Sequence, residues 1–169
     1  MFGDINRATI ISNSATFVGL ITLGSWISIP FVPVPLTLQT LFVLLSGAVM
    51  RRYAAIPVIL YLFLGMMGLP LFHNGLSGVG ILLGPTGGYL IGFVPAALIT
   101  GLFYEKGSNL IRVAGLVLSI MVIYLCGIAW LCWSTGIGLA AGLFIGLVPF
   151  IPGDILKVSA AYLIADRLL

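Results

Sequence analysis

The sequence predicts an all-α integral membrane protein with six transmembrane helices and both termini in the cytoplasm. Hydrophobic residues make up 61% of the 169 residues, against only seven Lys and Arg and four Asp and Glu. This composition is typical of membrane domains. We expect one transmembrane domain over residues 1–169, with no soluble catalytic or nucleotide-binding module.

The six candidate helices are apolar runs bounded by Pro, Gly or charged residues, because a spanning helix needs about 20 apolar residues. They cover residues 8–29, 35–50, 53–69, 87–104, 110–133 and 151–168. The first run lacks the features of a cleaved signal peptide, so we interpret it as a retained helix. The glycine-rich stretch 135–150 is left over. We interpret it as a broken or re-entrant segment that leads into the last helix.

The basic residues set the predicted topology. With six spans and a cytoplasmic N-terminus, six basic residues lie on the cytoplasmic side: Arg7, Arg51, Arg52, Lys106, Arg112 and Arg167. No predicted outer connection then contains Lys or Arg, as the positive-inside rule requires. A seventh span over 135–150 would send Arg167 across the membrane. Trp26, Trp130 and Trp133 fall near predicted outer helix ends, where aromatic residues are enriched.

One carboxylate and one ammonium lie inside the last predicted helix, at Asp154 and Lys157. Residues three apart share a helix face, and Pro152 in the first turn places Asp154 near the helix N-terminus, where negative charge is favoured. A charge at membrane depth costs about 3 kcal/mol on insertion scales. The pair therefore predicts a functional site; the alternative is an ion pair that only joins helices.

The remaining polar candidates come from two predicted outer connections, residues 30–40 and 70–88. Three prolines favour extended backbone in the first, and the second is rich in glycine. Both are apolar and uncharged, so we expect them to fold over the bundle as a lid. Tyr89, at the end of the second, suits ligand contact and an interfacial anchor equally. The candidate ligand-binding residues are Thr37, Gln39, Asn74, Tyr89, Asp154 and Lys157.

We expect neither enzyme activity nor a cofactor or metal. The run Gly84-Pro85-Thr86-Gly87-Gly88 lacks the Gly-Lys-Ser/Thr ending of a phosphate-binding loop. One His and two cysteines that cannot face each other on a helix do not make a metal centre. Two alternatives remain open: an intramembrane enzyme that uses Asp154 as general acid or base, and a structural subunit of a larger membrane complex.

Small residues recur on one side of the first helix at helical spacing. Ala8, Ser12, Ala15 and Gly19 form a stripe that lets another helix approach closely. The sequence does not choose between a partner protein and a neighbouring helix of the same bundle.

Four segments, in order along the chain, resemble the BioY family: residues 34–40 (VPLTLQT), 68–72 (GLPLF), 84–89 (GPTGGY) and 149–157 (PFIPGDILK). BioY proteins are the biotin-specific substrate-binding (S) components of energy-coupling factor (ECF) transporters. The resemblance implies a six-helix subunit in a prokaryotic plasma membrane that binds biotin from outside with high affinity. It also implies a transmembrane coupling protein and two cytoplasmic ATPases as partners, with the small-residue stripe as the docking surface.

The polar candidates suit the ureido ring of biotin, which offers two N–H donors and one carbonyl. Asp154 can accept from an N–H, Lys157 can donate to the carbonyl, and Asn74 can do both. For the biotin carboxylate, Lys157, Tyr89 and backbone N–H groups of the glycine-rich loop remain open. The near alternative is an S component for another vitamin.

Overall fold

The computed structural model describes residues 7–168, and its secondary structure is almost entirely helical. Two short strands and two 3₁₀ turns connect the helices. The α-helices are α1 (Arg7–Trp26), α2 (Gln39–Met50), α3 (Ala55–Met66), α4 (Val79–Leu83), α5 (Gly87–Glu105), α6 (Asn109–Thr135), α7 (Leu139–Gly146) and α8 (Ile151–Leu168).

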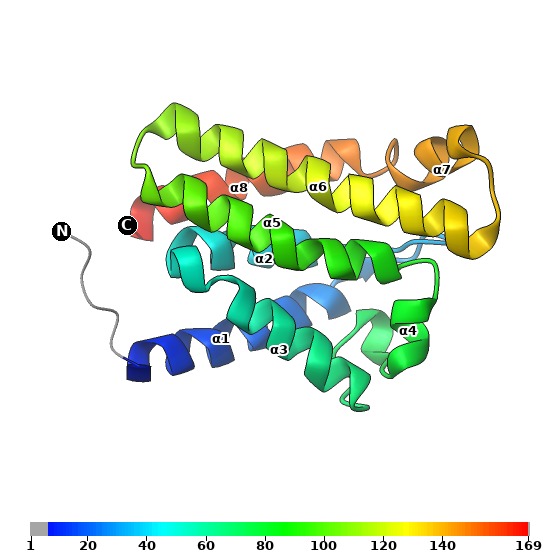
Figure 1. Cartoon of the computed structure of the whole chain (residues 1–169), viewed down its shortest axis with the longest axis horizontal. Helices are drawn as coiled ribbons and strands as arrows, with labels where there is room; N and C mark the ends of the chain where they lie inside the picture. The colour runs from blue at the N-terminus through cyan, green and yellow to red at the C-terminus, as the bar shows by residue number, and fades with distance from the viewer. Residues whose placement is uncertain (1–6, 169) are drawn as a thin grey trace.

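The longer helices alternate in direction along one common axis (Figure 1). The start of α1, the α2–α3 turn, the α5–α6 turn and the end of α8 lie together at what we call the basic end. The connections 27–38, 67–86 and 136–150 lie at the opposite end, which we call the pocket end. The charges follow this division as the sequence predicts: Arg51, Arg52, Lys106, Arg112 and Arg167 occupy the basic end.

The number of complete membrane spans stays a prediction. Within the described residues, α1, α5 and α6 are long and apolar enough to cross a bilayer alone, and up to five spans result if each bent helix pair counts as one. Helices α2 and α3 have 12 residues each and meet at 119°. Each is about 18 Å long, whereas a bilayer core is about 30 Å thick.

The second predicted helix begins later than the sequence suggested, at Gln39 instead of Pro35. The proline-rich segment before it is extended, as expected, and forms a short antiparallel pair, β1 (Ser28–Ile29) with β2 (Leu36–Thr37). The Leu38 N–H then donates to the carbonyl of Gly24, 2.9 Å away. The chain therefore returns along the end of α1 before helix formation begins, which brings Thr37 and Gln39 to the pocket end.

The loop from 67 to 86 folds over the pocket end, where contacts with three helices hold it in place. Trp26 of α1 donates to the Pro70 carbonyl (3.1 Å), and Trp130 of α6 donates to the Gly84 carbonyl (3.0 Å). Phe72 is fully buried against Gly65 of α3, where a Cβ would lie 2.4 Å from its ring. We call residues 67–86 the outer loop. It contains α4, which the sequence did not indicate, and a 3₁₀ turn over His73–Gly75, where the His-Asn-Gly sequence is typical of a turn.

The predicted break before the last helix is confirmed. Helix α7 ends at Gly146, the chain turns over residues 147–150, and α8 begins at Ile151 at an angle of 53° to α7. Pro152 lies in the first turn of α8, so its missing N–H costs no helical hydrogen bond. This break starts α8 inside the bundle and places Asp154 in its first turn.

Candidate functional site

A pocket at the pocket end joins side chains from the segment 34–40, the outer loop, α5, α6, the α7–α8 turn and α8. It unites five of the six predicted ligand-binding residues: Thr37, Gln39, Tyr89, Asp154 and Lys157. Further polar lining residues are Thr40, His73, Thr86 and Tyr124. Aliphatic and aromatic side chains complete the wall, including Leu90, Phe93, Ile123 and Phe150.

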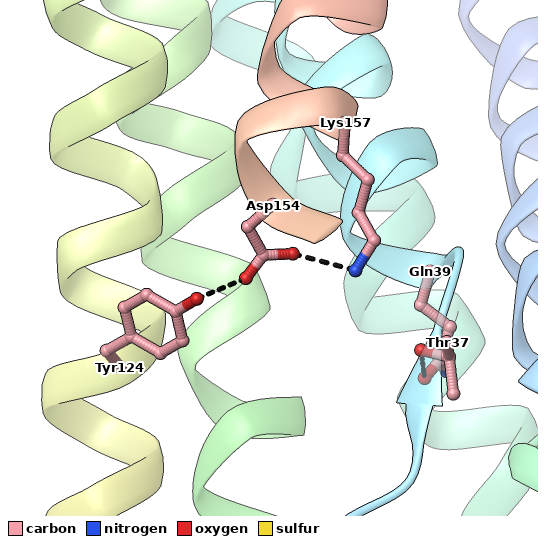
Figure 2. A network of polar contacts seen from close by, with 5 residues as sticks. All are labelled: Thr37, Gln39, Tyr124, Asp154 and Lys157. Carbon is pink, nitrogen blue, oxygen red and sulfur yellow. Dashed lines mark hydrogen bonds and ion pairs between the residues drawn. The ribbon is translucent and has the colours of Figure 1, made fainter. Parts of the chain in front are cut away.

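The charged residues form a buried ion pair within α8. The Lys157 Nζ donates to the Asp154 Oδ1 at 2.7 Å (Figure 2). Asp154 is 7% exposed and Lys157 8% exposed, so both charges are largely removed from solvent. Asp154 and Lys157 therefore lie on the same face of α8, as their spacing of three residues predicted. The pair nevertheless uses only one N–H of the ammonium, which leaves two donors.

Tyr124 of α6 supplies the second partner of the carboxylate. Its hydroxyl donates to the Asp154 Oδ2 at 2.5 Å, across the α6–α8 interface (Figure 2). The two carboxylate oxygens therefore have different partners on different helices, which fixes the carboxylate plane. The sequence did not single out Tyr124, because an aromatic residue inside a 27-residue apolar helix looks like ordinary packing.

Gln39 is held by a chain of hydrogen bonds at the start of α2. Thr37 Oγ1 donates to Gln39 Oε1 (3.0 Å), and Gln39 Nε2 donates to the hydroxyl of Tyr61 on α3 (2.5 Å). The amide retains one N–H and one lone pair for other partners. Thr37 and Gln39 lie together beside the Asp154–Lys157 pair (Figure 2).

Tyr89 presents its ring to the pocket. Its hydroxyl donates to the Gly146 carbonyl (2.7 Å), and its ring stacks on Phe150 with centroids 6.2 Å apart. Gly127 of α6 makes room for the ring, since a Cβ there would lie 2.3 Å from it. Tyr89 is 7% exposed. This burial inside the bundle argues against a role as an anchor at the membrane interface.

Asn74 lies outside the pocket lining. It is exposed, has a left-handed backbone (φ 56°), and its Oδ1 accepts a hydrogen bond from Ser28 of β1 at 2.9 Å. The preceding residue, His73, lines the pocket instead. Burial lowers the pKa of the His73 imidazole, which favours its neutral form.

The small-residue stripe of α1 lies on the exposed surface of the bundle. Ala8, Ser12, Ala15 and Gly19 are all exposed. A Cβ added at Gly19 would have nothing within 4 Å. Close packing inside this chain therefore does not account for the four small residues.

The side chains of the site are suited to binding a ligand through hydrogen bonds and apolar contacts. One carboxylate offers acceptors, one ammonium offers donors, and hydroxyl and amide groups surround them within apolar walls. Among residues 7–168, no three His, Cys, Asp or Glu side chains gather where they could hold a metal ion. Such a set suits a small molecule with a polar head and an apolar body.

Fold and pocket together define a helical membrane protein with a ligand-binding pocket near one end of its bundle. A solved structure with the same architecture is the S-component for biotin from an ECF-type ABC transporter, with a TM-score of 0.88 and 28% sequence identity over 99% of this chain and 94% of that one. The chain belongs to the BioY family, whose family model matches residues 5–169.

Two relatives agree with this assignment. The chain is 42% identical over 154 residues to the biotin transporter BioY of Thermotoga maritima, covering 90% of each protein. It is 39% identical over 163 residues to a probable biotin transporter BioY of Pyrococcus horikoshii, covering 96% of this chain and 97% of that protein.

Proposed function

We propose that this chain is the high-affinity biotin-binding membrane subunit of an ATP-driven, ECF-type vitamin importer. The observation that carries the proposal is the buried Asp154–Lys157 pair, which lines a pocket together with Tyr124, Thr37 and Gln39. The named function of the relatives, biotin transport, supports the same ligand.

The polar set matches the ureido head of biotin group by group. The carboxylate of Asp154 accepts from a ureido N–H, and a free N–H of the Lys157 ammonium donates to the ureido oxygen. The thioether ring then lies against the aromatic wall of Tyr89, Phe93 and Phe150. Hydrogen bonds to charged groups are among the stronger ones, which suits a high affinity.

The valerate carboxylate of biotin requires donors on another side of the pocket. The Tyr89 hydroxyl already donates to Gly146, which leaves the phenol no proton for the ligand. The outer loop contributes His73 and Thr86 to the pocket lining. We place the carboxylate toward this loop, with the His73 ring and backbone N–H groups as its donors.

Transport requires an energy source that this chain is not expected to contain. We propose that a transmembrane coupling protein and two cytoplasmic ATPases supply it, with the exposed stripe of Ala8, Ser12, Ala15 and Gly19 as the docking face. In this arrangement the subunit lies in a prokaryotic plasma membrane, with the basic end in the cytoplasm and the pocket end outside.

Titration calorimetry of the purified chain tests the ligand. We expect biotin to bind tightly, and a panel of other vitamins in excess to leave biotin binding unchanged. Strong binding of another vitamin, with no heat from biotin, would identify the chain as an S component for that vitamin and contradict the proposal.

A further inference from the structure

The hydroxyl of Thr37 begins a chain of hydrogen bonds whose direction is fixed at its far end. That end is the Leu71 carbonyl, which can only accept, so Tyr61 donates its single proton to it at 3.0 Å. The Tyr61 oxygen then accepts from Gln39 Nε2, and this turns the amide oxygen of Gln39 toward Thr37. Thr37 therefore donates its own proton to Gln39 Oε1, 3.0 Å away.

Because its proton is committed, the Thr37 oxygen can only accept a further hydrogen bond. Thr37 lines the pocket together with Asp154 and Lys157, and it shares with Lys157 the wall of a second, apolar cavity beside α8. Figure 2 shows the Lys157 ammonium between the Asp154 carboxylate on one side and the Thr37–Gln39 pair on the other. Across the pocket, the groups therefore follow the order acceptor, donor, acceptor.

A cyclic urea carries the complementary order of groups. Its two N–H bonds point to opposite sides of its carbonyl, so hydrogen bonds of ordinary length place the two acceptors about 7 Å apart, with the donor to the carbonyl between them. Asp154 and Lys157, which contact each other, match one N–H and the carbonyl. The second N–H then points away from Asp154, toward the side of the pocket that Thr37 occupies.

We propose that Thr37 is a specificity-determining residue whose hydroxyl oxygen accepts a hydrogen bond from the ureido N–H that lies farther from Asp154. This proposal rests on the proposed function, with biotin as the ligand. The competing role is positional: Thr37 would only hold the Gln39 amide in place. The two roles differ in whether the effect of the Thr37 hydroxyl depends on a particular N–H of the ligand.

A cycle that combines a protein change with a ligand change separates the two roles. The ligands are biotin and two lactam analogues, in which a CH₂ group replaces either the N1′–H or the N3′–H, and competition against labelled biotin measures each affinity. We expect Thr37→Val to weaken biotin binding about 10- to 100-fold, because an N–H loses its partner in a desolvated site. For one of the two lactams the same substitution changes affinity less than about threefold, since that contact is already absent.

Two further substitutions serve as controls. Thr37→Ser keeps the hydroxyl and retains biotin binding. Thr22→Val removes the hydroxyl of a buried threonine on α1 that bonds the Val18 carbonyl outside the pocket, and it leaves all three affinities unchanged. Valine is β-branched like threonine and suits strand β2, and thermal unfolding verifies that each variant is folded. If Thr37→Val does not fold, Thr37→Ala takes its place.

The outcomes distinguish this inference from the proposed function. A wild-type protein that does not bind biotin contradicts the proposed function itself. A wild type that binds biotin, with Thr37→Val reducing affinity for all three ligands by the same factor, assigns Thr37 a positional role and overturns the inference. Unchanged biotin affinity in folded Thr37→Val overturns it as well. If neither Thr37→Val nor Thr37→Ala folds, the hydroxyl serves folding and the inference is likewise overturned.

Discussion

The side-chain amide of Gln39 donates a hydrogen bond to the fully buried hydroxyl of Tyr61, and that hydroxyl donates in turn to the carbonyl of Leu71 at 3.0 Å. Ser25 of α1 donates to the same carbonyl at 2.6 Å. One tyrosine on α3 thus joins a pocket residue to the outer loop. Because Tyr61 also packs edge-on against Phe72, the loop is anchored by both polar and apolar contacts.

Tyr61→Phe tests this connection. The substitution keeps the ring but leaves the Gln39 amide and the Leu71 carbonyl each without one partner. We expect a loss of about 1–3 kcal/mol in unfolding free energy, the typical cost of unpaired buried polar groups. Thermal unfolding in detergent measures it. Tyr53→Phe, at the basic end, is the matched control and should behave as wild type. Equal stability of the two variants would show that the Tyr61 hydroxyl does not anchor the loop.

Gly127→Ala tests how α6 positions Tyr89. The added methyl would lie 2.3 Å from the Tyr89 ring, so the ring must move and its stacking on Phe150 is lost. We expect a destabilisation of about 1–3 kcal/mol, as for other overpacked sites, together with weaker biotin binding. Gly19→Ala, where nothing lies within 4 Å, is the control and should change neither property. Wild-type biotin affinity in a folded Gly127→Ala protein would remove Tyr89 from the binding wall.

The exposed stripe of α1 predicts a variant that separates binding from transport. Ala15→Leu places a bulky side chain in the stripe at an exposed position. We expect biotin affinity of the isolated chain to stay within about twofold of wild type, as for other surface changes, while biotin uptake by cells is lost. Ala114→Leu, on an exposed face of α6, is the matched control and should support normal uptake. Normal uptake with Ala15→Leu would contradict docking through the stripe.

His73 predicts a pH dependence of stability. Its pKa is lower in the folded protein than in the unfolded chain because burial disfavours the charged ring. The unfolded state therefore binds more protons below the usual histidine pKa, and stability falls as the pH decreases through that range. We expect a lower Tm at about pH 5.5 than at about pH 7.5. His73→Gln should flatten this difference, and since His73 is the chain's single histidine, an unchanged pH profile would exclude its contribution.

The sequence predicts those parts of the candidate site whose residue type or spacing stands out from the surrounding chain. The charges of Asp154 and Lys157 stand out in an apolar chain, and their spacing alone places them on one helix face. Tyr124 and Tyr61 carry no such signal, because only the packing of α6 on α8 and of α3 on α2 gives their hydroxyl groups partners. Thr37 and Gln39 were predicted to belong to a helix that begins at residue 35, but Thr37 lies in β2 and α2 begins only at Gln39, after the strand pairing with residues 28–29.

Asn74 illustrates the limit of composition as a guide. A polar residue in an apolar loop suggests ligand contact, which stays a prediction for Asn74: its side chain is exposed, lies outside the pocket lining and accepts a hydrogen bond from Ser28. His73, one position earlier, lines the pocket. The sequence does not specify which of these two adjacent polar residues faces the pocket.

The biotin affinities of Asp154→Asn, Lys157→Gln and the double variant, each measured beside thermal stability, test the central claim most directly. If the pair binds the ureido head, each single substitution costs about 2–5 kcal/mol, roughly 30- to 5000-fold in affinity, because the remaining buried charge loses its partner. The proteins stay folded, and the double variant does not regain binding. Near-normal biotin affinity in a folded Asp154→Asn protein, or recovery of binding in the double variant, would contradict the claim and leave the pair a purely structural role.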